Sequence, residues 1–184
     1  MTRLLVIFKK IMKKHPILLN STIYGTMYVS AELLQQILTK QILNKNDHPE
    51  PVDKGVLVRY AIMGSCITSN ILFFWYKWLD KNFIGTAPKT VIKKLLLDQF
   101  VMSPPFYVIF YTTMSVMEGK SNIFEECKKK FVPTYKMDFL FWPPAQVINF
   151  LLVPPTNRII YMSMCSFVWI NILCCIKRKD LNML

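Results

Sequence analysis

The sequence predicts an all-α integral membrane protein: a bundle of about four transmembrane helices with an amphipathic N-terminal helix and a proline-interrupted interfacial segment. Of its 184 residues 53% are apolar and only 5 are glycine. The apolar residues gather in blocks close to the roughly 20 residues that cross a bilayer as a helix. A formal net charge of +12 accompanies these blocks, which is typical of a membrane protein with basic loops. A soluble nucleic-acid-binding protein would also be basic but would lack the apolar blocks, so we expect no nucleic-acid partner.

Residues 1–15 predict an amphipathic helix ahead of the membrane domain. Its apolar side chains share one helical face, and its basic side chains fall largely elsewhere. The apolar set is Leu4, Leu5, Phe8, Ile11 and Met12, and the basic set is Arg3, Lys10, Lys13 and Lys14. This pattern is typical of an uncleaved mitochondrial-type address, but an ordinary surface anchor helix would have the same pattern.

Four apolar blocks in the membrane domain, residues 16–176, are candidates for spans. They cover about residues 17–39, 56–79, 93–117 and 159–176, and a basic tail, residues 177–184, follows them. Four spans would place both termini on the same side of the membrane. The distribution of Lys and Arg favours the positive-inside face for that side.

Residues 139–157 are uncharged but contain two proline doublets, Pro143 with Pro144 and Pro154 with Pro155. Proline has no backbone N–H, and its ring clashes with the preceding turn, so each doublet is expected to interrupt a regular helix. We therefore expect an interfacial or re-entrant segment here, with only a short helix, about residues 145–152, between the doublets.

The first predicted span carries a polar stripe. Glu32, Gln35 and Gln36 follow one another at i, i+3 and i+4, and Tyr28 lies one turn before Glu32. Lipid cannot satisfy such groups, so this face meets water or polar partners. A water-filled pathway makes these four residues candidates to line a pore. A bundle core joined by interhelical hydrogen bonds explains the same stripe.

Two further ionisable residues lie in or directly beside predicted spans. Asp98 lies four residues after Lys94, so a local ion pair is expected. Arg158 is the only charged residue between Asp138 and Lys177. Its side chain should reach the membrane surface or pair with an intramembrane acid, for which Glu32 and Asp98 are the candidates.

No enzyme motif is present. The chain has no zinc-protease helix motif, no nucleophile elbow and no glycine-rich phosphate loop. The five cysteines form no C-x-x-C pair, and the two histidines are far apart, so no zinc spacing exists. We therefore expect no catalytic residues, no metal and no cofactor.

Two groups of residues resemble a known family. The first is Trp75, Asp80, Asp98 and Gln99, and the second is Trp142, Pro143, Gln146, Asn149, Pro154, Arg158 and Trp169. Their spacing is similar to that of the Mpv17/PMP22 family of peroxisomal and mitochondrial membrane proteins. Glu32 with Gln35 and Gln36 echoes an early acidic-then-Gln pattern of that family. The chain departs from the pattern at Ser69 and Asn70, where the family usually has Gly-Pro, and so resembles a divergent member.

The resemblance implies about four spans and no catalytic activity. It also implies a channel for small solutes in the mitochondrial inner or the peroxisomal membrane, and in some members a role in mitochondrial homeostasis. We therefore expect a passive pore for small hydrophilic solutes or ions, in the mitochondrial inner membrane or alternatively the peroxisomal membrane. Glu32 would be a fixed negative charge in this pore. Whether the chain forms a homo-oligomer is left open. The alternative is a non-conducting scaffold whose basic loops bind anionic lipid or partner proteins.

Overall fold

The computed structural model describes residues 15–38, 51–85, 87–153 and 158–178, and every regular element within them is a helix. The expected all-α class is therefore confirmed. The amphipathic helix expected over residues 1–15 falls, except for His15, outside the described residues. The same holds for the tail after Arg178.

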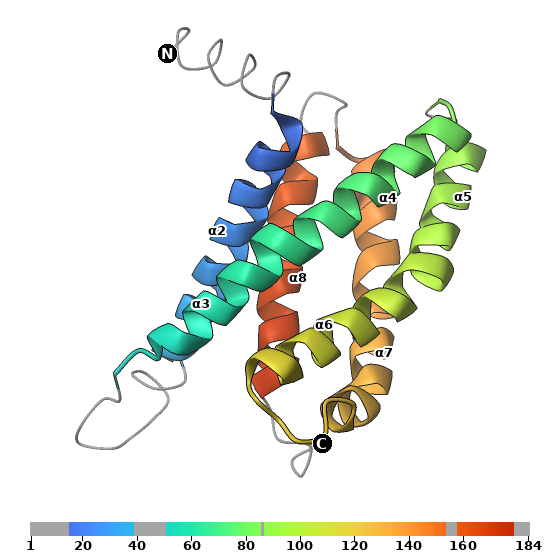
Figure 1. Ribbon diagram of the computed structural model, residues 1–184. Coiled ribbons are helices and arrows are strands. Elements are labelled where there is room, and N and C mark those ends of the chain that lie inside the picture. Colours follow the sequence, from blue (N-terminus) through green and yellow to red (C-terminus); the bar gives the residue numbers. More distant parts are fainter. Residues whose placement is uncertain (1–14, 39–50, 86, 154–157, 179–184) are drawn as a thin grey trace, which may run out of the picture.

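The described chain runs along the bundle five times, in alternating directions (Figure 1). The passes are α2 (Pro16–Gln36), α3–η2–α4 (Lys54–Ile62, Met63–Thr68, Ser69–Asn82), α5–η3–α6 (Pro88–Leu97, Asp98–Met102, Ser103–Met117), α7 (Glu125–Leu151) and α8 (Arg158–Arg178). Because a pass along the bundle need not cross the membrane, the expected count of about four transmembrane spans stays a prediction. The start of α2 and the end of α8 lie at opposite ends of the bundle, not together.

Two of these passes are long and apolar enough to cross a membrane. They cover Lys54–Asn82, with 29 residues, and Pro88–Met117, with 30 residues. At about 1.5 Å per residue each is longer than the roughly 30 Å hydrocarbon core of a bilayer. They contain the predicted spans 56–79 and 93–117. By the same measure of length and composition, the described parts of the other two predicted spans do not qualify.

The fourth pass is α7, which continues through prolines that were expected to end it. Pro133, Pro143 and Pro144 all lie inside this helix, so the expected interruption at the first doublet is wrong. Each internal proline costs helix stability, but α7 is held by packing beside it. The Trp142 ring lies 6.2 Å from the Trp169 ring of α8, measured between centroids. The second doublet lies outside the described residues, and so the interfacial placement of residues 139–157 stays a prediction.

Both long apolar passes contain a π-helical segment, η2 and η3. A π-helix is wider than an α-helix, is usually short and often occurs at functional sites. In the third pass the π segment η3 ends at Met102, and Pro104 and Pro105 follow in the first turn of α6. Proline is tolerated in the first turn of a helix because its missing N–H is not needed there. The chain therefore passes these prolines without leaving the helix.

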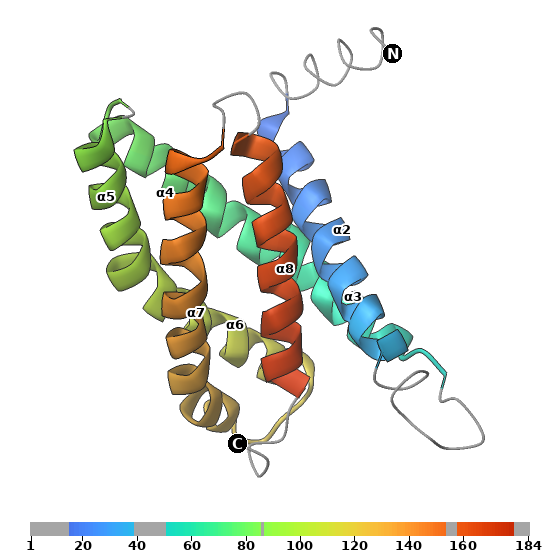
Figure 2. The same cartoon turned by 180° about the vertical axis from the view of Figure 1, so that it is seen from behind.

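The helices pack around a core of tyrosine, phenylalanine and methionine side chains. Figure 2 shows α8 between α2 and α7. The closest approach of α2 to the second pass is at Gly64. A Cβ atom there would lie 2.7 Å from the Tyr24 carbonyl oxygen and 3.0 Å from the Tyr28 ring. Only glycine allows the two backbones to approach so closely.

Candidate functional site

One end of the bundle contains a cavity of about 830 Å³. It forms where the last turn of α2, the start of α3, the loop after α6, the start of α7 and the last turn of α8 meet. Five acidic and five basic residues are among those that line it. These are Glu32, Asp53, Glu118, Glu125 and Glu126, with Lys120, Lys129, Lys130, Lys177 and Arg178. We call this the end cavity. Because acids and bases are equal in number, its wall is polar but close to neutral overall.

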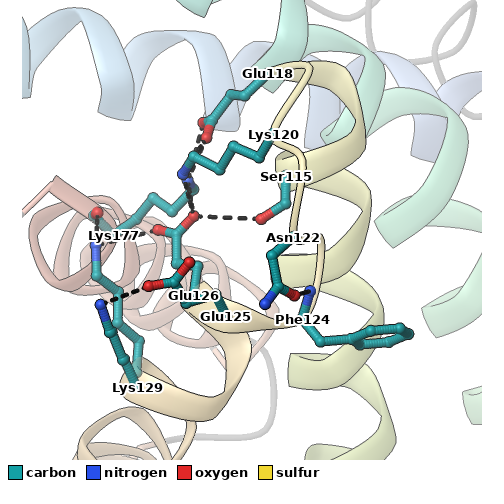
Figure 3. A network of polar contacts seen from close by, with 10 residues as sticks. Ser115, Glu118, Lys120, Asn122, Phe124, Glu125, Glu126, Lys129 and Lys177 are labelled. Carbon is teal, nitrogen blue, oxygen red and sulfur yellow. Dashed lines mark hydrogen bonds and ion pairs between the residues drawn. The ribbon is translucent and has the colours of Figure 1, made fainter.

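Glu126 is the centre of an ion-pair network on the wall of the end cavity (Figure 3). Although it is only 8% exposed, its Oε2 accepts hydrogen bonds from Lys120 at 2.6 Å and from Lys177 at 2.7 Å. Its Oε1 accepts from Lys130 at 3.1 Å. Lys177 also donates to both oxygens of Glu118, at 2.8 and 3.0 Å. The network therefore joins the loop after α6 to the first turn of α7 and the last turn of α8.

The network keeps its carboxyl groups ionised. Burial alone would raise the pKa of Glu126, but hydrogen bonds from Lys120 and Lys177, with the nearby lysine charges, outweigh burial and lower the pKa to about 2. The pKa of Glu118 is lowered in the same way: hydrogen bonds from the same two lysines exceed the effect of burial. The network is thus fully charged at neutral pH.

Glu32 and Gln36 also lie on the wall of the end cavity, and each is 1% exposed. Arg178 bonds to Glu32 Oε1, and Gln36 Nε2 donates to the same oxygen at 3.0 Å. The Gln36 Oε1 accepts from the backbone N–H of Asp53 at 2.7 Å, which fixes the start of the second pass against α2. The charge of Glu32 is therefore balanced by Arg178, not free. The side chain of Arg158 is outside those described, so its expected pairing with Glu32 or Asp98 stays a prediction.

A second, smaller cavity of about 80 Å³ lies inside the bundle, and we call it the inner cavity. Side chains from all five passes line it. Its polar lining residues are Tyr24, Tyr28, Thr68, Tyr76, Asp98, Ser103, Tyr107, Asp138 and Ser166. Two tryptophans of the family pattern, Trp142 and Trp169, also lie on its wall. Its wall is largely apolar, with Leu72, Met102, Phe106 and Ile170 also lining it, and the polar groups among them suit bound water or a small polar ligand.

The polar stripe predicted on α2 is divided between different surroundings. Tyr28 lines the inner cavity, where its hydroxyl accepts a hydrogen bond from Thr68 at 3.2 Å. Glu32 and Gln36 line the end cavity. Gln35 is not among the lining residues of either cavity, and its Nε2 donates to the backbone oxygen of Asn171 at 3.4 Å. The stripe thus serves both cavities and also helix packing.

The two cavities approach each other at a pair of tyrosines. Tyr28 lines the inner cavity and Tyr60 lines the end cavity. Each is 2% exposed, and their ring centroids are 6.3 Å apart. The walls of the two cavities therefore come close together at these two rings.

The family-pattern residues of α4 and η3 bond across helices. Asp98 accepts hydrogen bonds from Trp75 Nε1 at 2.8 Å and from the Tyr76 hydroxyl at 3.3 Å. Asp80 pairs with Lys94 at 2.6 Å. The expected pair between Lys94 and Asp98 is therefore wrong. The tryptophan and tyrosine of the second pass point at Asp98, and Lys94 reaches the preceding helix instead.

The remaining family-pattern residues, Gln99 of η3 and those of α7, have structural surroundings where they are described. Gln99 and Asn149 are buried, at 2% and 5% exposure. Pro143 lies inside α7, and Gln146 is half-buried. Pro154 lies outside the described residues. None of these contributes to the lining of the end cavity.

Sequence reasoning missed Asp138, which is 1% exposed and receives a hydrogen bond from the Tyr107 hydroxyl. It also missed the buried bond between Tyr111 and Thr134, at 2.6 Å. Residues 118–138 are polar and predict a surface loop with a short helix that stops before Pro133, whereas Thr134 and Asp138 lie within α7. The signal available was that Asp138 is the last charge before a long uncharged block.

The described chain is a helical bundle with two apolar passes of membrane length, as a membrane protein would have. Comparison with known families agrees. Residues 115–174 match the model of the Mpv17/PMP22 family. The chain is 38% identical over 170 residues to a Mpv17-like protein of Xenopus laevis, covering 92% of this chain and 81% of the relative. The chain belongs to the Mpv17/PMP22 family, as its motifs predicted, and its environment is a lipid bilayer.

Other relatives cover similar shares of the chain. A Mpv17-like protein of Bos taurus is 31% identical, covering 88% of this chain and 78% of the relative. Peroxisomal membrane protein 2 of Bos taurus is 26% identical, with coverage of 88% and 83%. No solved structure matches the chain.

Proposed function

We propose that the chain is a passive, non-catalytic pore for small hydrophilic solutes or ions in an organelle membrane. The observation that carries the proposal is a pair of cavities, both with polar side chains on their walls, that come close together at Tyr28 and Tyr60. Polar side chains placed one after another along the inside of a membrane bundle provide the hydrogen bonds that a hydrated solute loses on entry. In this proposal the conformation described is the closed one, with the two rings as the barrier between the cavities.

The end cavity is the wide entrance in this proposal. It is open to the surroundings, since the side chains of Lys129 and Glu125 on its wall are 60% and 56% exposed. Its equal numbers of acidic and basic residues suit small solutes that carry charges of either sign. Glu32 lies on the path, but Arg178 balances its charge, so Glu32 contributes less to ion preference than a free carboxylate would.

The mitochondrial inner membrane is the proposed location, with the peroxisomal membrane as the alternative. The basic, acid-free segment over residues 1–15 supports the mitochondrial choice. One relative bears the name peroxisomal membrane protein 2, which supports the alternative. Microscopy of the full chain with a C-terminal fluorescent tag, against markers of both organelles, decides between them.

The pore proposal is tested by electrical recording from purified protein in planar bilayers. Wild-type protein should give discrete conductance steps. Tyr60→Ala should raise the open probability, because it removes one of the two rings that would form this barrier. Tyr161→Ala is the matched control, since Tyr161 is not among the residues lining either cavity, and it should behave as wild type. Silent bilayers, with folded protein shown to be inserted, would refute the proposal.

One observation favours a second candidate, the non-conducting scaffold. Glu32 and Gln36 are 1% exposed and bonded, as expected of groups that join helices. Cysteine placed at Gln36 in a cysteine-free chain separates the two proposals. Rapid reaction with a water-soluble thiol reagent supports the pore, and full protection in folded protein supports the scaffold.

A further inference from the structure

Two acidic side chains of the described part of the chain lie on the wall of the inner cavity. Asp98 and Asp138 both line it, and none of its lining residues is Lys, Arg or His. They are close enough for the charge of Asp98 to act on Asp138. A carboxylate in a protein interior is costly unless something balances its charge. A proton or a bound cation must therefore supply what the side chains on this wall do not.

Asp138 has unused capacity to bind a ligand. It is 1% exposed and accepts a hydrogen bond from Tyr107 through Oδ1. The side chains of Ser103 and Gln99 lie near its carboxyl group. Even so, Oδ2 of Asp138 is buried without a hydrogen-bond partner. Both polar side-chain atoms of Gln99, which lies beside Asp138 but does not line the cavity, are also without one. Native proteins leave few buried polar atoms unsatisfied, and the free Oδ2 on the cavity wall points to a missing ligand.

Both π-helical segments end on the same cavity. Thr68 is the last residue of η2, Asp98 is the first residue of η3 and Met102 is its last. All three line the inner cavity. A π segment weakens the regular helix and is found most often where a binding site requires it. Thr68 of η2 and Met102 of η3 bring two π segments from different passes to one cavity, an observation that does not depend on the two carboxyl groups.

We propose that the inner cavity binds one monovalent cation of the size of potassium or ammonium, held by Asp138 and balanced also by Asp98. Hydroxyl oxygens of Tyr28, Ser103 and Tyr107 lie on the same wall and can complete the coordination. The volume of about 80 Å³ holds an ion with one or two waters, since a single water needs roughly 10–15 Å³ by this measure. The described residues bring no three metal-binding side chains together, which argues against a divalent metal.

The site goes beyond the proposed pore, because it can bind its ion whether or not the chain conducts. Its test is therefore a binding measurement on the purified full chain in detergent. Melting temperature is recorded in potassium chloride and in N-methyl-D-glucamine chloride at equal ionic strength and fixed pH. Potassium should raise the melting temperature by about 3 °C for each tenfold rise above its dissociation constant. The large organic cation should not, since it does not fit the cavity.

Radioactive rubidium, as a potassium substitute, gives the stoichiometry and the location. Wild-type protein should bind about one rubidium ion per chain. Asp138→Asn should abolish this binding, and Asp98→Asn should weaken it about tenfold. Asp80→Asn is the matched control, because Asp80 is exposed and its partner is Lys94, and it should bind as wild type.

Three results would overturn the proposal. The first is an identical melting temperature in the two salts with a response to pH alone, which would mean that a proton balances the carboxyl groups. The second is no rubidium bound to folded wild-type protein, a result that needs no variant. The third is unchanged rubidium binding in folded Asp138→Asn.

Discussion

Arg178, in the last turn of α8, bonds to Glu32 of α2 across 146 positions of sequence. Glu32 is 1% exposed, so this bond supplies the positive charge that a buried carboxylate requires. It also fastens the last helix of the bundle to the first.

The first prediction concerns this pair. Arg178→Gln should destabilise the protein by about 1–3 kcal/mol, because it leaves a buried carboxylate without its cation. The double variant with Glu32→Gln should recover part of the loss. Thermal unfolding in detergent measures both. Lys129→Gln is the control, because Lys129 pairs with Glu125 on the surface at 60% and 56% exposure, and its effect should be below about 0.5 kcal/mol.

A second prediction follows from the network around Glu126. Its pKa in the folded state, about 2, lies below its ordinary value of 4.5. The stability that it contributes is therefore complete above pH 4.5 and is lost as the pH falls toward 2. Glu126→Gln should be less stable than wild type at neutral pH, and the difference should shrink over this interval. A difference that does not change with pH would contradict the ion-pair account.

Gly64 provides a third prediction. A Cβ atom at this position would lie 2.7 Å from the backbone oxygen of Tyr24, and backbone cannot move aside without shifting α2. Gly64→Ala should therefore cost about 1–3 kcal/mol. Gly55→Ala is the comparison, because its nearest atom is a side-chain oxygen of Asp53, at 3.2 Å. Chemical denaturation of the purified variants would show whether only the first is destabilised.

A fourth prediction concerns the hydrogen bond from Trp75 to Asp98. Trp75→Phe keeps an aromatic ring but removes the N–H that Asp98 accepts at 2.8 Å. The expected cost is about 1–2 kcal/mol, because a largely buried carboxylate loses one of its two donors. Trp78→Phe is the matched control, since Trp78 stacks on Trp75 and is 47% exposed. Equal melting temperatures for the two variants would show that the bond to Asp98 adds nothing.

The helical class and the two long apolar passes could be predicted from sequence because they depend on composition and on local spacing. The continuation of α7 through Pro143 and Pro144 could not be predicted. Pro143 and Pro144 raise the local cost of a helix, but contacts between Trp142 and Trp169, 27 positions apart, help to keep α7 intact. Packing between distant segments is not visible in a local pattern. The continuous α7 was therefore not predicted.

The site was predicted in part for a similar reason. Spacing alone placed Glu32 and Gln36 on one helical face, and both lie on the wall of the end cavity. That this wall belongs to a pore stays a prediction. Asp138 was missed because its stretch looked like a loop. Lys94 was assigned the wrong partner because Asp80 becomes its neighbour only when α4 and α5 fold together.

The ion pairs at the end cavity have a consequence for motion. Glu32, Glu118 and Glu126 tie α2, α7 and α8 together at the end where α8 finishes. Rigid helices held at one end can separate only by tilting about that end. Hydrogen exchange of the backbone amides in α2 and α8 should therefore be fastest far from Arg178 and slow progressively toward it. High salt should reduce this gradient, because salt weakens the ion pairs at the partly exposed wall. The ion pairs would thus act as a pivot for α2 and α8. Changes of ionic strength at the end cavity would alter the tilt of these two helices at the opposite end of the bundle.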